Sequence, residues 1–191
     1  MVVILAAAFM GALGLSLVTV TMMGSKMSGS VRLQEEAFNA AEAGFDAARI
    51  FIEERLDGHE WTSFTDHTLS QPPGFDLPFV SGAANPAYFE RLTDEEILRS
   101  FDPGGDGAPD VAPLLFFRQK FARDENGAVD PRAVFTAFLI NDEAGGGSPD
   151  PSDAFLIVIG EIRAGTRTLA TTRLAIVLAI QLDGFGTGTP P

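Results

Sequence analysis

Residues 38–56 read FNAAEAGFDAARIFIEERL, and their apolar side chains recur at steps of three and four. That spacing places the apolar residues along one face of an α-helix. The charged residues fall largely off this face, and local ion pairs on a helix contribute only about 0.2–0.5 kcal/mol each. We therefore expect packing against the rest of the chain to hold this helix, through Phe38, Ala41, Phe45, Ala48, Ile52 and Leu56.

The predicted helix extends in both directions from this stretch. No proline interrupts residues 26–57, and Asp57-Gly58 supplies a stop, with Gly58 in the left-handed conformation that helix ends favour. Upstream, residues 1–25 carry no charge. As a helix, residues 1–23 would be about 35 Å long, enough to cross a bilayer core of about 30 Å. The sequence therefore predicts one long helix, apolar in its first half and amphipathic in its second.

The apolar half needs a second environment in which to hide from water. Small residues in this segment would allow close approach of another helix, so the segment could serve as a membrane anchor and as a self-association element. An ordinary single-pass anchor, carrying a monomeric extracytoplasmic binding module, is the alternative. The residues that we assign to this transmembrane or filament-core helix are Met1, Val2, Val3, Ile4, Leu5, Ala8, Gly11, Gly14 and Leu15.

Composition excludes several functional classes. The chain has 191 residues, with 13 basic and 26 acidic side chains and a formal net charge of −13. This length allows one domain with an appendage. The acidic balance and the scattered basic residues argue against nucleic-acid binding, because phosphate backbones would be repelled. Because there is no cysteine, disulfides and thiolate chemistry are excluded.

An acidic insertion follows the helix at residues 58–112. It is rich in Pro, Gly and Asp, which is typical of surface loops. One short helix is predicted inside it, with Thr93 as N-cap, Glu96 at the capping-box position and an end near Phe101. Aromatic side chains are spaced to attach the insertion to the domain, namely Phe64, Phe75, Phe79, Tyr88 and Phe89.

Four segments rich in Phe, Ile, Val and Leu follow, at residues 114–122, 133–141, 154–164 and 166–182. Short connections between them favour antiparallel pairing. We therefore predict an α+β fold in which the long N-terminal helix packs on a C-terminal antiparallel β-sheet, with a loop-rich acidic insertion. The predicted divisions are 1–25 for the apolar helix, 26–57 for the amphipathic helix, 58–112 for the insertion, 113–183 for the sheet head and 184–191 for a flexible tail.

The sequence offers little to support catalysis. His59, Glu60, Asp66 and His67 match no zinc spacing, and there is no nucleophile elbow or phosphate-binding glycine loop. We predict no catalytic residues and no cofactor. Two acidic loops could supply calcium ligands, but neither has the EF-hand pattern, so solvated loops are favoured. The weak calcium candidates are Asp102, Asp106 and Asp110 in one loop, and Asp142, Asp150 and Asp153 in the other.

The run QEEAFNAAEAGFDAAR at residues 34–49, following an uncharged helix, resembles the type IV pilin and pseudopilin superfamily, and most closely its PilX-type minor pilins. The resemblance covers roughly residues 1–57 and is strongest at AFNAAEAG, residues 37–44. It implies a filament subunit that is inserted in the inner membrane as a precursor, trimmed by a prepilin peptidase, methylated at its N-terminus and then polymerised through its N-terminal helix.

The resemblance also implies partners and a location. The partners would be other pilins in a homo- or hetero-oligomeric filament, and a tip adhesin; the assembled location would be the cell surface or the periplasm, in a pilus or a type II secretion pseudopilus. The family's usual glutamate at the fifth position is Leu5 here, counting from Met1 as the processed N-terminus. In lacking this glutamate, the chain resembles the family members that sit at or near the filament tip.

Overall fold

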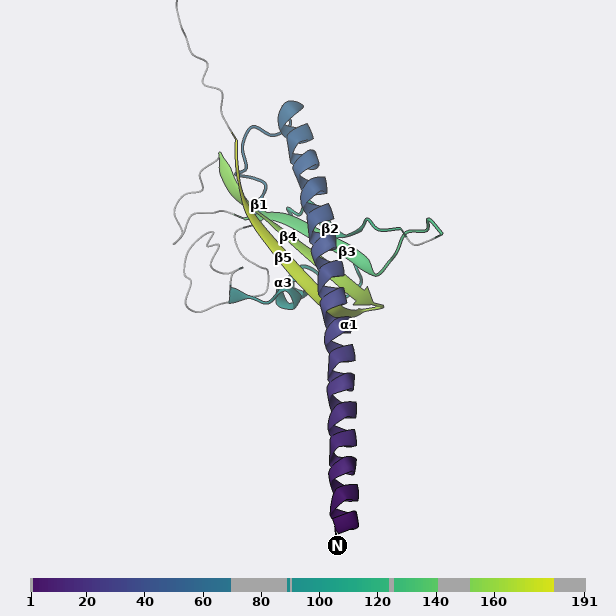
Figure 1. Cartoon of the computed structure of the whole chain (residues 1–191). Coiled ribbons are helices and arrows are strands. Elements are labelled where there is room, and N and C mark those ends of the chain that lie inside the picture. The colour runs from purple at the N-terminus through teal and green to yellow at the C-terminus, as the bar shows by residue number, and fades with distance from the viewer. Residues whose placement is uncertain (1, 70–88, 90, 124–125, 141–151, 181–191) are drawn as a thin grey trace, which may run out of the picture.

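The computed structural model describes residues 2–69, 89, 91–123, 126–140 and 152–180, with the side chains of the first helix described from residue 27 onward. The chain begins with one helix, α1 (Val2–Asp57), and continues through β1 (Thr68–Leu69), α3 (Asp94–Phe101), β2 (Phe116–Lys120), β3 (Ala133–Ile140), β4 (Asp153–Ala164) and β5 (Arg167–Ala179). Figure 1 shows the C-terminal part of α1 lying across the sheet, while its purple N-terminal part extends well beyond it. We call the strands, α3 and their connections the head.

The five strands form one mixed sheet. Its order is β1-β3-β4-β5, and β2 pairs with β3 along the edge that β1 also uses. β3 and β4 pair antiparallel from Ala133 with Ile162 to Ile140 with Phe155, and β4 and β5 form a long antiparallel hairpin. β1 instead runs parallel to the end of β3, pairing Thr68 with Leu139 and Leu69 with Ile140.

The central strands β3 and β4 are buried on both faces of the sheet. On β3, Phe135, Ala137 and Leu139 face a core shared with α1, whereas Phe138 and Ile140 face a second core shared with α3. β4 alternates in the same way, because successive residues of a strand point to opposite faces. The result is a three-layer arrangement of helix, sheet and helix with loops.

α3 is fixed locally by the capping box that its sequence predicts. The Thr93 hydroxyl accepts a hydrogen bond from the backbone N–H of Glu96, and the Glu96 carboxylate accepts one from the backbone N–H of Thr93 at 2.8 Å. Ile97, Leu98 and Phe101 then point into the second core. The prediction of a short helix that starts at Thr93 and ends near Phe101 is confirmed.

α1 approaches the sheet very closely at two glycines. A Cβ added at Gly160 would lie 2.1 Å from the backbone oxygen of Ala37 and 2.5 Å from the backbone nitrogen of Ala41. A Cβ at Gly44 would lie 2.7 Å from side-chain atoms of Phe135 and of Val158. The helix therefore lies on the sheet backbone itself, and only small residues fit at the contact.

The predicted fold class is wrong in two respects, although its α+β character fits. The sheet is mixed rather than antiparallel, because β1 adds a parallel pairing that two residues without an alternating pattern do not signal in the sequence. The predicted membrane-spanning helix is also not borne out: no helix within the described part of the chain has both the length and the apolar character that crossing a membrane requires.

The C-terminal end of α1 also differs from its prediction. The left-handed residue is His59, with φ of 58°, and not Gly58. The backbone N–H of Gly58 still bonds to the carbonyl of Glu54, so helical geometry continues through the glycine. The backbone N–H groups of Glu60 and Trp61 then both donate to the carbonyl of Arg55, which closes the helix end.

Candidate functional site

The face of α1 that meets the head follows a line of small residues. Among the predicted packing residues, Ala41, Ala48 and Ile52 are buried, Phe45 and Leu56 are half-buried, and Phe38 is 42% exposed. The buried line instead begins at Ala37, because a phenylalanine has no room where the helix backbone contacts Gly160. Thus the alanines and the glycine of AFNAAEAG form the contact, and its phenylalanine lies outside it.

Polar contacts fix the point at which α1 leaves the sheet. The side-chain amide of Gln34 donates to the backbone oxygen of Thr171 at 2.8 Å and to the hydroxyl of Thr172 at 2.7 Å. Beside these contacts lies an exposed hollow on α1 that is lined by Val31, Phe38 and Thr172 among others. Together with exposed Met27, these side chains place apolar surface at the base of the projecting part of α1.

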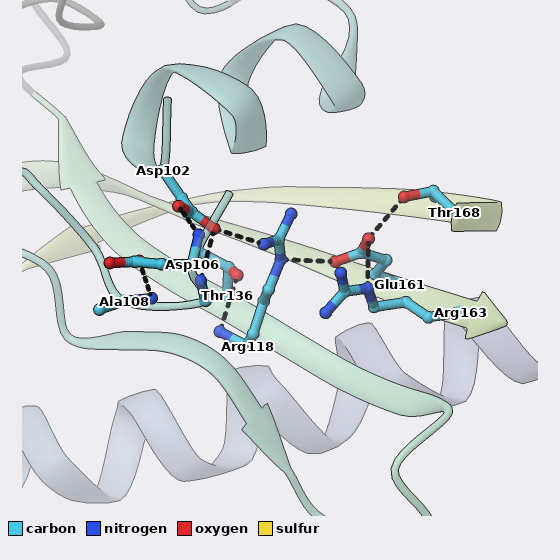
Figure 2. A network of polar contacts seen from close by, with 9 residues as sticks. Asp102, Asp106, Ala108, Arg118, Thr136, Glu161, Arg163 and Thr168 are labelled. Atoms are coloured by element: carbon cyan, nitrogen blue, oxygen red, sulfur yellow. Dashed lines mark hydrogen bonds and ion pairs between the residues drawn. The ribbon is translucent and has the colours of Figure 1, made fainter. Parts of the chain in front are cut away.

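A buried network of charges lies on the opposite face of the sheet (Figure 2). Arg118 of β2 bridges two carboxylates, with Nη1 2.9 Å from Oδ2 of Asp102 and Nε 3.3 Å from Oε2 of Glu161. Both carboxylate side chains are 1% exposed. The hydroxyl of Thr168 donates to Oε1 of Glu161 at 2.6 Å, and Arg163 Nε lies 3.3 Å from the same oxygen. Such buried ions require several partners to offset the loss of water.

The backbone of Arg118 departs from normal strand geometry to reach these partners. Its φ is 44°, within a break in the β2–β3 register between Phe116 and Gln119. Its backbone N–H donates to the hydroxyl of buried Thr136 at 3.1 Å. A bulge of this kind turns one side chain away from the strand's regular alternation, and here it directs the guanidinium toward Asp102 and Glu161.

The predicted calcium loop is organised differently from a metal site. Asp102 accepts hydrogen bonds from the backbone N–H groups of Asp106 and Gly107, each at 3.1 Å, in addition to its ion pair with Arg118. Asp106 bonds to the backbone of Ala108, and Asp110 is exposed. Within the described part of the chain, no three acidic or histidine side chains come together to hold a metal. Asp142 and Asp150 lie outside the described residues.

The remaining predicted residues have structural positions. Phe64 and Phe89 are fully buried, on opposite faces of the sheet, whereas Phe75, Phe79 and Tyr88 lie outside the described residues. The ring of His67 stacks on Trp61 with centroids 3.8 Å apart. His59 is exposed at the end of α1, with Nδ1 2.9 Å from the carbonyl oxygen of Asp57.

One functional-looking feature was not predicted from the sequence. Glu161 is a lone carboxylate in the apolar run AFLIVIGEI of β4, and such a residue indicates a buried polar partner. The partners themselves come from Arg118 and Asp102, which only the fold brings beside β4. Comparisons with known proteins give no further guide: no family model, no curated protein and no solved structure matches this chain.

Proposed function

We propose that this protein is a structural subunit of a type IV pilin-like or pseudopilin-like filament and that it performs no catalysis. One observation carries the proposal: α1 continues as a single helix from Val2 to Asp57, yet only its C-terminal part lies on the sheet. The part that extends beyond the sheet contains no charged residue from position 2 to position 25.

A long uncharged helix that projects from its own domain leaves a continuous surface to be covered. Copies of the same helix can cover one another, because Gly11, Gly14 and the alanines between residues 6 and 12 permit close helix contact. The head then faces outward and carries the chain's acidic charge. We extend the proposal to a minor or tip-associated subunit, since residues 1–25 contain no carboxylate in place of the glutamate that pilins usually carry in this helix.

The test is to image what the purified full-length chain forms, alone and with candidate partner pilins. We expect fibres, and we expect a variant lacking residues 1–23 to be excluded from them. The variant's thermal unfolding should match that of the full chain, because the N-terminal part of α1 extends beyond the sheet and the described contacts of the helix with it lie in the C-terminal part. Equal entry of the truncated and full-length chains into fibres would overturn the proposal.

The alternative is a monomeric anchored module that binds a ligand through its head. This alternative predicts single particles at every concentration and no change in assembly when residues 1–23 are removed. The same images therefore decide between the two functions.

A further inference from the structure

A hollow of about 540 Å³ lies between α3 and the β4–β5 turn. Four arginines line it, Arg99 from α3, Arg118 from β2, Arg163 from β4 and Arg167 from the turn region, out of 13 basic residues in the whole chain. In a protein of net charge −13, this concentration of positive side chains is unusual. We call this hollow the arginine pocket.

The four arginines differ in how far their guanidinium groups are paired with carboxylates. Arg118 is held between Asp102 and Glu161, and Arg99 pairs with Glu95 one turn earlier on α3 at 3.0 Å. Arg163 is close to Glu161, but its buried Nε lacks a hydrogen bond with proper geometry. Arg167 is exposed and makes no hydrogen bond or ion pair with the residues that the structure describes. Arg167 therefore retains unused guanidinium donors, whereas Arg163 faces Glu161 with its Nε buried.

We propose that the arginine pocket binds side-chain carboxylates of an acidic protein segment. A guanidinium presents paired N–H donors in the geometry of an oxyanion, so exposed Arg167, with Arg163 in the same lining, fits such a group. Asp102, which also lines the pocket, and Glu161, which pairs with Arg163, would oppose a phosphate dianion more strongly than a carboxylate of single charge.

The size and lining of the arginine pocket favour a peptide over a free ion. A volume of about 540 Å³ is in the range of sites for larger ligands and far exceeds one small anion. Leu98 and Pro103 also line the pocket and add apolar surface, against which the stem of an acidic side chain or its backbone can pack. This binding does not depend on filament assembly and is measured separately from it.

The experiment measures binding of fluorescently labelled hexaglutamate to the full-length chain by anisotropy, with hexaglutamine as the neutral control. We expect hexaglutamate to bind, hexaglutamine not to bind, and the affinity to fall as sodium chloride is raised. Arg167→Gln should weaken binding about tenfold, in line with loss of a charge-assisted hydrogen bond. Because Arg167 is exposed and has no partner among the described residues, this variant should fold normally.

Two further variants complete the test. Arg163→Gln should weaken binding by a similar factor, and Arg49→Gln should leave it unchanged, because Arg49 lies on α1 across the sheet and pairs only with Glu53. Equal losses in Arg49→Gln and Arg167→Gln would overturn the proposal, as would unchanged affinity in Arg167→Gln. Binding of inorganic phosphate without binding of hexaglutamate would also overturn it, by showing a site for a free anion.

Discussion

Two glycines set how close α1 can come to the sheet, and they do so through missing atoms. Gly160 lets the backbone of Ala37 and Ala41 lie against β4, and Gly44 accommodates the side chains of Phe135 and Val158. Close packing of this kind maximises contact between helix and sheet but tolerates no added volume. The run of alanines and glycine in AFNAAEAG is therefore explained by the fit to the sheet.

Gly160→Ala should destabilise the protein by about 3 kcal/mol, because the new methyl group would meet helix backbone that cannot rotate away. Gly29→Ala is the matched control: nothing lies within 4 Å of its added Cβ, and alanine favours the helix by about 1 kcal/mol. Urea unfolding of both variants should give shifts of opposite sign. A small shift for Gly160→Ala would show that the helix can retreat from the sheet.

The capping box of α3 should make stability depend on pH. The pKa of Glu96 is lowered from its ordinary value of 4.5, chiefly by the hydrogen bond from the backbone N–H of Thr93. A carboxylate with a lowered folded pKa stabilises the protein above its unfolded pKa, and that contribution is lost as pH falls through the folded value. We expect stability to decline below about pH 4.5.

Glu96→Gln is the measurement for this effect. Glutamine does not titrate, so the variant should be less stable than the natural chain at pH 7 and should approach it at pH 3. Urea midpoints across that range test the prediction. A constant difference between the two proteins at every pH would contradict it.

The buried carboxylates of Asp102 and Glu161 depend on the positive charge of Arg118. Arg118→Met would remove the cation between two carboxylates that are almost wholly buried, at a cost of about 3 kcal/mol. Arg49→Met breaks an exposed pair with Glu53 on α1 and should cost less than about 0.5 kcal/mol. Denaturant unfolding should separate the two variants clearly; similar small losses would mean that water replaces the guanidinium.

At the scale of the elements, local signals predicted more than long-range ones. The capping box of α3 and the apolar runs of β2 to β5 are formed by residues close together in the sequence, and those segments appear in the structure. β1 has only two residues and is positioned by its parallel pairing with β3, so no local pattern marks it. The bulge that turns Arg118 toward Asp102 depends on strand register, which the sequence does not reveal.

One further signal in the sequence was not used in the prediction. The sequence VFTAFLI of β3 is apolar on nearly every residue, and a strand buried on one face alternates instead. That continuous run indicates a strand covered on both sides, as it is here by α1 and by α3. The predicted helix stripe differs from the structure at Phe38: periodicity gives the face, but only packing against Gly160 decides that Ala37 and not Phe38 lies against the sheet.

The assignment of the α1 face leads to a direct test. Ile52→Ala should cost about 3 kcal/mol, because Ile52 is buried between α1 and the sheet. Phe38→Ala removes a larger side chain but should cost only about 1 kcal/mol or less, since much of that side chain is already in water. Urea unfolding of both variants checks the order. The reverse order would place Phe38 in the core.

At the scale of the whole molecule, the three packed layers provide stability, and the projecting part of α1 is the proposed assembly element. One core of the molecule is shared between the sheet and the C-terminal part of α1, and the other between the sheet and α3. Under the proposed function, the uncharged part of α1 that extends beyond the sheet serves assembly. Assembly and folding should then respond to different substitutions.

Gly14→Leu tests this separation. Bulk at position 14 should weaken close contact between helices and lower fibre yield severalfold, as judged by sedimentation and electron microscopy. The thermal midpoint of the head should stay within about 2 °C of the natural chain, because Gly14 is far along α1 from Gln34 and the sheet. Undiminished fibre yield would count against helix packing as the basis of assembly.

The backbone contact of α1 with Gly160 has a mechanical consequence. α1 is one unbroken helix that contacts β4 and extends beyond the sheet. A rotation of its N-terminal end would therefore be transmitted along the helix to the strands. In an ordered array of such chains, the direction in which each head faces would follow from the rotation of its α1 helix about the helix axis.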